Sequence, residues 1–466
     1  MFSEQSRTSA LQLKFVVVGA STSGLSVAYL LRRSGHDVVV VERHSHVPQA
    51  SVDGGLRIPP NMARLLQDFP GMKELMTEKA TVCSGVSFCS GETMKLLGQM
   101  VFSEQVMTDL GSNFYLMSYS DMVSHLYKLC QDIGVTMKHN FSVKEVISSP
   151  DSVPAVISAS GTRLTGDIII GADGRNSVVR RLMFPEEPES EDDDLVIPGS
   201  RSSTPAAQAH EIVSVSLTVP TRLMERDPEL QSLTKNDRFM LWTGNGHATS
   251  GSPCGPDRYN FGLTYSNYIQ PDSDVIGADW YDSKPISTME GSLSSYHPVL
   301  QKLVKLAPVC YWNSQTSPCL SKYSNEFNQV ALIGDAAHCV PINSSYNTSL
   351  AFEDAVTFGR IFSRIKSRAD VPSLLNGFNE IKRRRTRQTE NTEHSAVAVI
   401  GIPPGPHRDA RDTALAKTLE LEGADDETLA NAWSEYLQAF NYDANDAVEE
   451  WRRTWAMTMR HTYDQL

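Results

Sequence analysis

The first residues whose types and spacing could do chemistry form a short turn after the apolar run 15–18. Small residues in such a turn let backbone N–H groups and the start of a following helix approach a pyrophosphate. Gly19 and Gly24 match the first and third glycines of G-x-G-x-x-G, Ser21 takes the place of the second, and Ser23 lies beside them. The turn predicts a dinucleotide site, with a tight turn that binds nothing as the alternative.

Three carboxylates follow apolar runs at positions that a nucleotide cofactor could reach. Glu42 ends the next run, roughly 20 residues beyond the glycine turn, where a carboxylate can accept hydrogen bonds from both ribose hydroxyls. Asp173 and Asp335 each follow a further apolar run and a glycine. Ligands of parallel sheets bind at the carboxyl ends of the strands, so these aspartates could bond a polyol such as the ribityl chain of a flavin. For Asp173, a buried turn-forming residue is the alternative.

The elements that must position these residues alternate between strand and helix. Residues 15–18, 38–41, 168–170 and 330–333 are continuous apolar runs, which are typical of buried parallel strands. The runs lie before residue 185 and after residue 325, so the sequence predicts an α/β, Rossmann-like domain that is interrupted by an insertion. The insertion alternates polar and apolar residues, which predicts a mixed or antiparallel sheet. The predicted parts are 11–184 and 320–395 for the nucleotide domain, 185–319 for a β-rich substrate domain, and 396–466 for a helical C-terminal region.

Two charged segments are expected at the surface. Residues 186–194 are rich in Asp and Glu, and Pro, Ser and Gly dominate from there to residue 204, which predicts a solvated linker. The run Lys382, Arg383, Arg384 and Arg385 is most simply the solvent-exposed face of a helix.

Composition excludes several classes of protein. The 466 residues carry a net charge of −13, which argues against sequence-independent nucleic-acid binding. The seven cysteines include no CxxC pair, so neither a disulfide framework nor a metal site is expected. No apolar stretch reaches the length of a membrane span, and the start of the chain has no apolar segment of a signal peptide. We therefore expect a cytoplasmic protein, whose oligomeric state the sequence does not define.

Together, these segments resemble the three motifs of the FAD-dependent aromatic hydroxylases, which are group A flavoprotein monooxygenases, and most of all the fungal salicylate hydroxylase-like members. The resemblance implies an FAD-binding domain. It places the FAD near Gly19, Ser21, Ser23, Gly24, Glu42, Arg43, Arg57, Asp173, Asp335 and Asn347. The chain departs from the pattern at Tyr119, where relatives often have a pyrophosphate-binding arginine. It departs again at Ser345, Tyr346 and Asn347, where relatives have a glycine-containing turn.

The resemblance also implies an activity. NAD(P)H would reduce the flavin transiently, O₂ would form a C4a-hydroperoxide, and a phenolic or enolic small molecule would be hydroxylated, with or without decarboxylation, in fungal secondary metabolism. One alternative is a flavin oxidoreductase that dehydrogenates, epoxidises or cyclises its substrate. The other is a degenerate FAD-fold protein that binds a small molecule without turnover.

Three residues are candidates for catalysis. Arg57 lies in a segment that follows the flavin in this family, and its guanidinium could anchor a phenolate or carboxylate. A surface position or a contact with the flavin phosphates is the alternative for Arg57. The inserted sheet should supply the far wall of the substrate site, with His247 as a possible base and Tyr265 or Trp242 stacking on the ring. Alternation leaves open which of these side chains point inward.

Overall fold

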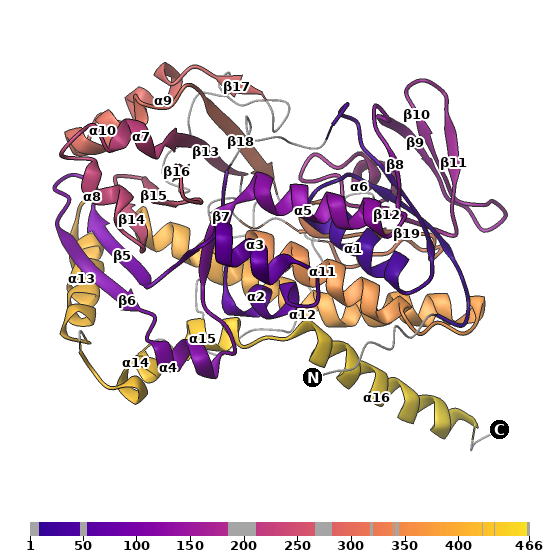
Figure 1. The fold of residues 1–466 in the computed structure, drawn as a ribbon. Helices are drawn as coiled ribbons and strands as arrows, with labels where there is room; N and C mark the ends of the chain where they lie inside the picture. The colour runs from indigo at the N-terminus through magenta and orange to yellow at the C-terminus, as the bar shows by residue number, and fades with distance from the viewer. Residues whose placement is uncertain are drawn as a thin grey trace.

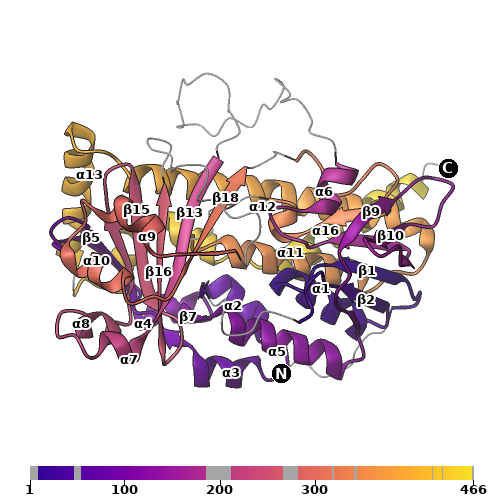
Figure 2. The same ribbon diagram turned by 90° about the horizontal axis from the view of Figure 1, so that it is seen from above.

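The computed structural model describes residues 9–46, 54–184, 211–265, 282–316, 320–338, 340, 344–421, 423–432 and 434–463. A parallel sheet and a larger mixed sheet lie side by side, and long helices run along both of them (Figures 1 and 2). The predicted acidic linker, residues 186–204, lies outside the described residues.

The parallel sheet has the strand order β19-β12-β1-β2-β8. Its strands are β1 (Lys14–Val18), β2 (Asp37–Val41), β8 (Thr136–Lys138), β12 (Ile168–Gly171) and β19 (Val330–Leu332). Four of them are the predicted apolar runs, and they are apolar because both faces of the sheet are buried in one large core. That core includes side chains of α1 (Thr22–Arg33), α5 (Tyr119–Asp132), α11 (Asn347–Phe362) and the small sheet of β9 (Val143–Ile147), β10 (Ala155–Ser158) and β11 (Arg163–Thr165).

The larger sheet has eight strands in the order β17-β18-β13-β16-β15-β14-β5-β6, and it is mixed because β14 and β5 run parallel. Its strands are β5 (Gly85–Ser90), β6 (Leu96–Val101), β13 (Glu211–Pro220), β14 (Phe239–Thr243), β15 (His247–Pro253), β16 (Arg258–Tyr265), β17 (Ser283–Lys284) and β18 (Cys310–Thr316). The predicted inserted sheet is therefore present, but it also recruits β5 and β6 from the part of the chain before residue 185.

The two faces of the larger sheet differ in chemistry. One face packs its apolar side chains against short helices: α7 (Thr221–Met224), α8 (Gln231–Thr234), α9 (Ser287–Glu290) and α10 (Pro298–Val304). The opposite face carries small and polar side chains such as Ser216, Ser250 and Asn260, which alternate with the apolar ones along each strand. This polar face is the one that can meet a ligand.

A three-stranded sheet in the order β3-β7-β4 links the two large sheets. Its strands are β3 (Gly55–Ile58), β4 (Thr81–Val82) and β7 (Tyr115–Ser118). The other described helices before residue 371 are four α-helices and three 3₁₀ helices: α2 (Pro60–Leu66), α3 (Met72–Lys79), α4 (Glu104–Asp109), α6 (Val178–Met183), η3 (Gly291–Leu293), η4 (Gly334–Ala336) and η5 (Arg368–Asp370).

The last part of the chain is helical, as predicted. The 30-residue helix α12 (Val371–Ile400) contacts α11 near one end and β15 towards the other, so it runs from the parallel sheet to the larger sheet (Figure 2). It is followed by α13 (Pro406–Ala416), η6 (Lys417–Leu421), α14 (Asp426–Ala432), α15 (Ser434–Phe440) and α16 (Ala444–Tyr463).

The basic run on α12 differs from its prediction. Lys382 and Arg385 are buried, whereas Arg383 and Arg384 are exposed. Lys382 Nζ lies 2.6 Å from Asp354 Oδ1. Arg385 donates two hydrogen bonds to the Glu353 carboxylate, and its Nη2 lies 2.9 Å from Glu353 Oε1. The run is therefore not a wholly exposed face, because two of its cations neutralise buried carboxylates of α11.

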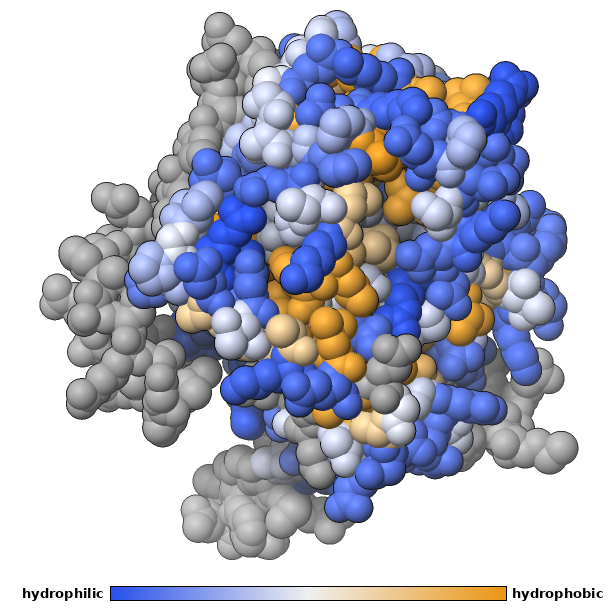
Figure 3. All heavy atoms as spheres, turned by 90° about the vertical axis from the view of Figure 1, so that its left-hand side faces the viewer, coloured by the Kyte–Doolittle hydropathy of each residue, from blue (hydrophilic) through white to orange (hydrophobic). Residues whose placement is uncertain are grey.

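The surface is mostly hydrophilic on the side of β5, β6 and α13, where one strip of hydrophobic side chains crosses the middle of the view (Figure 3). No helix in the described ranges combines the length and apolar character that a membrane crossing requires.

Candidate active site

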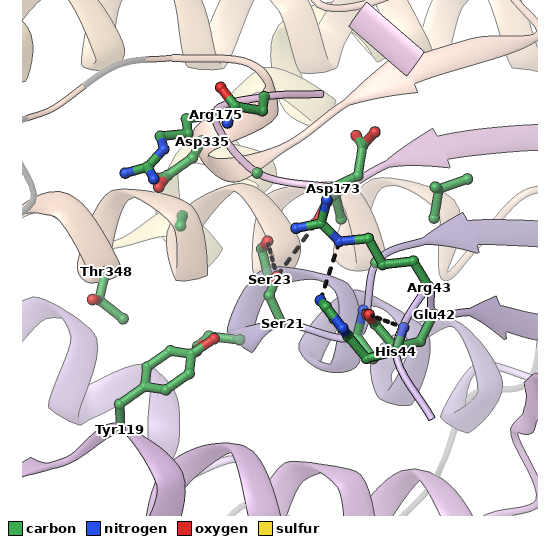
Figure 4. Close-up of a pocket in the computed structure, with 18 of the residues that line it drawn as sticks. Ser21, Ser23, Glu42, Arg43, His44, Tyr119, Asp173, Arg175, Asp335 and Thr348 are labelled. Carbon is green, nitrogen blue, oxygen red and sulfur yellow. Dashed lines mark hydrogen bonds between the residues drawn. The ribbon is translucent and has the colours of Figure 1, made fainter. Parts of the chain in front are cut away.

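A cavity of about 290 Å³ lies at the carboxyl ends of the parallel strands. Its walls come from the turns after β1, β2 and β12, from the η4 segment after β19, from β3, and from the starts of α5 and α11. Figure 4 shows Ser21 and Ser23 in the middle of this cavity, Glu42, Arg43 and His44 at one end, and Asp335, Arg175 and Thr348 towards the other. The cavity is thus an elongated site with distinct polar groups at its two ends.

The turn after β1 has the tight geometry that its glycines predict. Gly19 has a φ of +104°, and a Cβ there would lie 2.4 Å from the carbonyl oxygen of Ala172. A Cβ on Gly24 would lie 2.0 Å from the carbonyl oxygen of Gly19. Helix α1 starts at Thr22, and no hydrogen bond from the Ser21 side chain caps it. The first-turn N–H groups of α1 therefore face the cavity in the arrangement that suits a pyrophosphate.

Glu42 stabilises one end of the cavity through backbone contacts. Its Oε2 accepts a hydrogen bond from Ala20 N at 2.9 Å, and its Oε1 accepts one from His44 N at 3.0 Å. These two bonds fix the carboxylate on the cavity wall, and its contact with a ribose stays a prediction. Arg43 lies beside it on the cavity wall, and its Nε donates to His44 Nε2 at 3.2 Å.

Asp335 and Asn347 lie together at the other end. Asn347 Nδ2 donates to Asp335 Oδ1 at 3.2 Å and to the carbonyl oxygen of Val340 at 3.2 Å. Burial raises the pKa of Asp335, and the positive charge of His338 and Arg175 opposes that effect. Although the segment 345–349 lacks the glycines of its relatives, α11 still begins at Asn347, and Asn347 and Thr348 line the cavity.

Asp173 also lines the cavity, but its carboxylate is engaged with α6. Oδ1 accepts a hydrogen bond from Ser177 Oγ at 2.5 Å, and Oδ2 accepts one from Val178 N at 2.7 Å. This arrangement matches the alternative role as a buried turn-forming residue, since the carboxylate satisfies the first N–H groups of a helix.

A second, apolar pocket of about 110 Å³ lies between the polar face of the larger sheet and α12. Most of its wall is aromatic or aliphatic, from strands β5, β6 and β14, from the residues that follow β6 and precede β7, and from α12: Val86, Phe88, Met100, Phe102, Phe114, Phe239, Leu241, Ala396, Val397 and Ile400. Two stretches of chain lie near both the first cavity and the apolar pocket. Residues 344–346 line the pocket, and residues 347 and 348 line the cavity. Strand β3 places Gly55 and Leu56 on the cavity wall, and its Arg57 contacts Ser250 of the pocket.

Arg57 is only 6% exposed, so it is not a surface residue. Its Nη1 donates to the carbonyl oxygen of Ser344 at 2.9 Å, and its Nη2 donates to Ser250 Oγ at 3.2 Å. The guanidinium carbon lies 3.9 Å from the centre of the Phe239 ring. All three partners line the apolar pocket, which places the Arg57 guanidinium beside that pocket.

The comparisons with known proteins agree with this geometry. A family model described as "FAD binding domain" matches residues 12–201. The chain is 23% identical over 425 residues to FAD-dependent monooxygenase OpS4 of Beauveria bassiana (strain ARSEF 2860), a match that covers 91% of this chain and 92% of that protein. It is 24% identical over 433 residues to hispidin-3-hydroxylase of Neonothopanus nambi, covering 88% and 95%. The chain therefore carries an FAD-binding domain and is similar to FAD-dependent monooxygenases over most of its length.

A comparison with solved structures shows the same fold. A solved structure described as a salicylate hydroxylase substrate complex superposes on this chain with a TM-score of 0.69 at 17% identity, covering 94% of this chain and 97% of that one. The predicted resemblance, the fold class and FAD as cofactor are thereby confirmed.

The structure does not bring His247, Tyr265 and Trp242 to the pocket. His247 pairs with Tyr265 across β15 and β16, and its Nδ1 lies 3.0 Å from Tyr296 OH on the helix-covered face of the sheet. Trp242 is fully buried in the same core. Burial also lowers the pKa of His247. The predicted sheet is correct but the face is wrong, because side chains alternate and the neighbours Leu241, Ala248 and Thr264 are the ones that line the pocket.

Glu393 is a residue of the pocket that sequence reasoning missed. It lies on α12, is 7% exposed, and is the one acidic side chain among the residues described as lining this pocket. Burial raises its pKa to about 7, although Arg57 and the backbone N–H groups of Ser345 and Tyr346 pull it down. Helical periodicity is the sequence signal that could have predicted its burial. Glu393 follows the buried residues of the same helix face at helical spacing: Lys382, Arg385, Thr386 and Thr389.

Tyr119, which replaces the arginine of relatives, lies at the start of α5 and projects towards the α1 turn (Figure 4). Burial raises the pKa of its phenol to about 12, and a side-chain hydrogen bond with Thr22 opposes that effect. Its hydroxyl is therefore neutral and lies beside the turn after β1.

We expect Tyr119→Arg to bind FAD roughly tenfold more tightly, because a guanidinium adds a charge-assisted contact with the pyrophosphate that the phenol cannot make. Titration of the apoprotein with FAD, followed by flavin fluorescence, gives the dissociation constant. Tyr119→Phe is the matched control and should change it only slightly. Weaker binding by a folded Tyr119→Arg protein would contradict a pyrophosphate at this position.

Proposed function

We propose that FAD lies along the first cavity with its adenosine ribose at Glu42 and Arg43, its pyrophosphate at the start of α1, and its ribityl chain at Asp335. The isoalloxazine then lies between β3 and the start of α11, beside Asn347 and Thr348. The contacts that support this order are the backbone-held carboxylate at one end, the narrow glycine turn in the middle and the Asp335–Asn347 pair at the other end.

We further propose that this protein hydroxylates a small phenolic or enolic ring at the expense of NAD(P)H. The single observation that carries this proposal is the apolar pocket, which adjoins the FAD cavity in the chain: residues 344–346 line the pocket, and residues 347 and 348 line the cavity. FAD, when bound, supplies the transfer of two electrons from NAD(P)H to O₂. One oxygen atom then replaces a ring hydrogen as a hydroxyl group, and the other leaves as water.

The chain's own residues position the ring and exclude water. The aromatic and aliphatic walls from β5, β14 and α12 favour a flat apolar molecule and keep the reacting atoms dry. Arg57 contributes a positive charge next to the pocket, which favours the ionised form of a ring hydroxyl. An ionised hydroxyl makes the ring electron-rich, and such a ring attacks an electrophilic oxygen most readily.

A panel of phenols and aryl acids tests the proposal, with NADH or NADPH oxidation and product formation measured under ¹⁸O₂. We expect substrate-stimulated oxidation and one ¹⁸O atom in the product. Product without the label would indicate dehydrogenation or cyclisation instead. A protein that binds FAD but shows no stimulated oxidation with any member of the panel would contradict hydroxylation of this substrate class.

We expect Ala396→Trp to raise the KM for the substrate at least roughly tenfold and to divert reducing equivalents to hydrogen peroxide, because the indole would fill the pocket. FAD content should stay unchanged, since Ala396 does not line the FAD cavity. The measurement is product formed per NAD(P)H consumed. Val399→Trp, at an exposed position on the same helix, is the matched control and should behave like the wild type. Equal coupling in both variants would place the substrate elsewhere.

A further inference from the structure

One face of α12 carries a line of buried polar side chains, formed by Lys382, Arg385, Thr386, Thr389 and Glu393. The two cations at its start pair with Glu353 and Asp354 of α11. Glu393 lies about two turns beyond Arg385, where the helix has left those partners and borders the apolar pocket. Arg385 therefore does not serve as a partner for Glu393.

The surroundings of Glu393 hold its carboxylate towards Arg57. The backbone N–H groups of Ser345 and Tyr346 donate to it, and Arg57 is the positive charge that acts on it. Arg57 also donates to the carbonyl oxygen of Ser344, which fixes the guanidinium next to the same turn. Ionised Glu393 and Arg57 thus carry opposite charges beside an apolar pocket, and those charges sum to zero when Glu393 has lost its proton.

This charge balance selects among substrates. A buried ionised aryl carboxylate would lie near the Glu393 carboxylate, and like charges at a desolvated site repel each other. A neutral ring that carries a hydroxyl group can instead donate a hydrogen bond to Glu393 and pack on Phe88, Phe239 and Leu241. The pocket therefore suits an uncharged phenol or enol better than a benzoate-type acid.

We propose that Glu393 is a catalytic residue that accepts the proton of the ring hydroxyl of an uncharged phenolic substrate. This inference rests on the proposed function. As the O–H bond breaks, its proton moves to a Glu393 carboxylate oxygen, and the electron pair left on the substrate oxygen drives the ring carbon to form its new C–O bond. The O–O bond of the reduced oxygen breaks in the same step, and its electron pair leaves with the second oxygen atom. The ring hydrogen then leaves as a proton, and Glu393 returns its proton to the substrate oxygen as aromaticity is restored. FAD and NAD(P)H supply the two electrons that convert the second oxygen atom of O₂ into water.

The ionisation of Glu393 fits this role. With a pKa of about 7, both protonation states are populated near neutral pH, as a group that takes up and returns a proton requires. The neighbouring groups do not titrate in this range. Burial lowers the pKa of Arg57 only to about 10, and burial raises that of the Cys83 thiol beside it to about 11. Among the described residues that line the pocket, Tyr346 is the other one with a titratable side chain. Below pH 7 Glu393 gains a proton, so turnover should fall as the pH falls through 7.

The test compares Glu393→Gln with Glu380→Gln, which changes an exposed glutamate of the same helix. With phenol or catechol at pH 8, we expect Glu393→Gln to retain FAD and lose roughly 100-fold in kcat, and to lose the fall in rate below pH 7. Glu380→Gln should match the wild type in both. Wild-type kcat and an unchanged pH profile in Glu393→Gln would overturn the proposal.

Binding of salicylate provides a readout that does not depend on turnover. The wild type should bind phenol but bind salicylate weakly, as seen in the difference spectrum of the bound flavin. Glu393→Gln removes the opposing negative charge, so its affinity for salicylate should rise roughly tenfold. If Glu393→Gln does not fold, wild-type preference for salicylate over phenol still overturns the inference. A wild type that hydroxylates no ring compound at all would instead contradict the proposed function.

Discussion

Replacement of Lys382 with methionine should lower the free energy of unfolding by about 3–5 kcal/mol, because it leaves a buried carboxylate without its main positive partner. Lys382 Nζ lies 2.6 Å from Asp354 Oδ1 and 3.8 Å from Glu353 Oε2, and all three side chains are buried. Burial alone would raise the pKa of Asp354, but Lys382 and His338 outweigh it and hold the pKa below its usual value. The ionised state of Asp354 therefore depends on Lys382.

Urea unfolding of the FAD-loaded protein measures this effect. Arg384→Met is the matched control, because it removes the same kind of charge from an exposed position on the same helix and should change stability by less than about 0.5 kcal/mol. Equal unfolding midpoints for Lys382→Met and the wild type would contradict the role of the pair. The stabilisation that Asp354 provides is present above the ordinary pKa of an aspartate and should decline as the pH falls towards its depressed pKa.

The contrast between Lys382 and Arg384 also shows a limit of sequence reasoning. A run of four cations is consistent with a solvated helix face, and two of them do lie on such a face. The other two are buried because Glu353 and Asp354 lie on a helix that packs against α12. That pairing joins residues about 30 positions apart, and nothing in the local spacing of the run identifies its partner.

The predicted parts of the FAD site depended on local rules. Gly19, Glu42 and Asp335 follow strand ends, and the carboxyl ends of parallel strands necessarily meet at one edge of the sheet. The substrate pocket depends on register instead. Leu241 and Trp242 are adjacent in sequence but lie on opposite faces of β14, so the choice between them needed the sheet pairing that only the structure provides.

Asp173 and Asp335 look alike in sequence but make different contacts, so their variants should differ. The Asp173 carboxylate is occupied by Ser177 and the start of α6. The Asp335 carboxylate lies half-buried on the cavity wall, where Asn347 donates a hydrogen bond to it. A polyol hydroxyl that donates to a buried carboxylate contributes about 1.5–3 kcal/mol to binding. Asp335 therefore has the capacity to contribute directly to FAD affinity, whereas Asp173 stabilises the wall.

Asp335→Ala should consequently weaken FAD binding roughly tenfold to a hundredfold without unfolding the protein. Titration of the apoprotein with FAD gives the dissociation constant, and circular dichroism reports the fold. Asp335→Asn keeps the shape and one acceptor oxygen, so it should lose less affinity than Asp335→Ala. Asp173→Ala should lower the melting temperature of the apoprotein more than it changes the FAD dissociation constant, because it removes the acceptor of the hydrogen bonds from Ser177 and from the first N–H groups of α6. If Asp335→Ala binds FAD as tightly as the wild type, the ribityl chain does not lie at Asp335, and the proposed direction of FAD along the cavity would have to be reversed or abandoned.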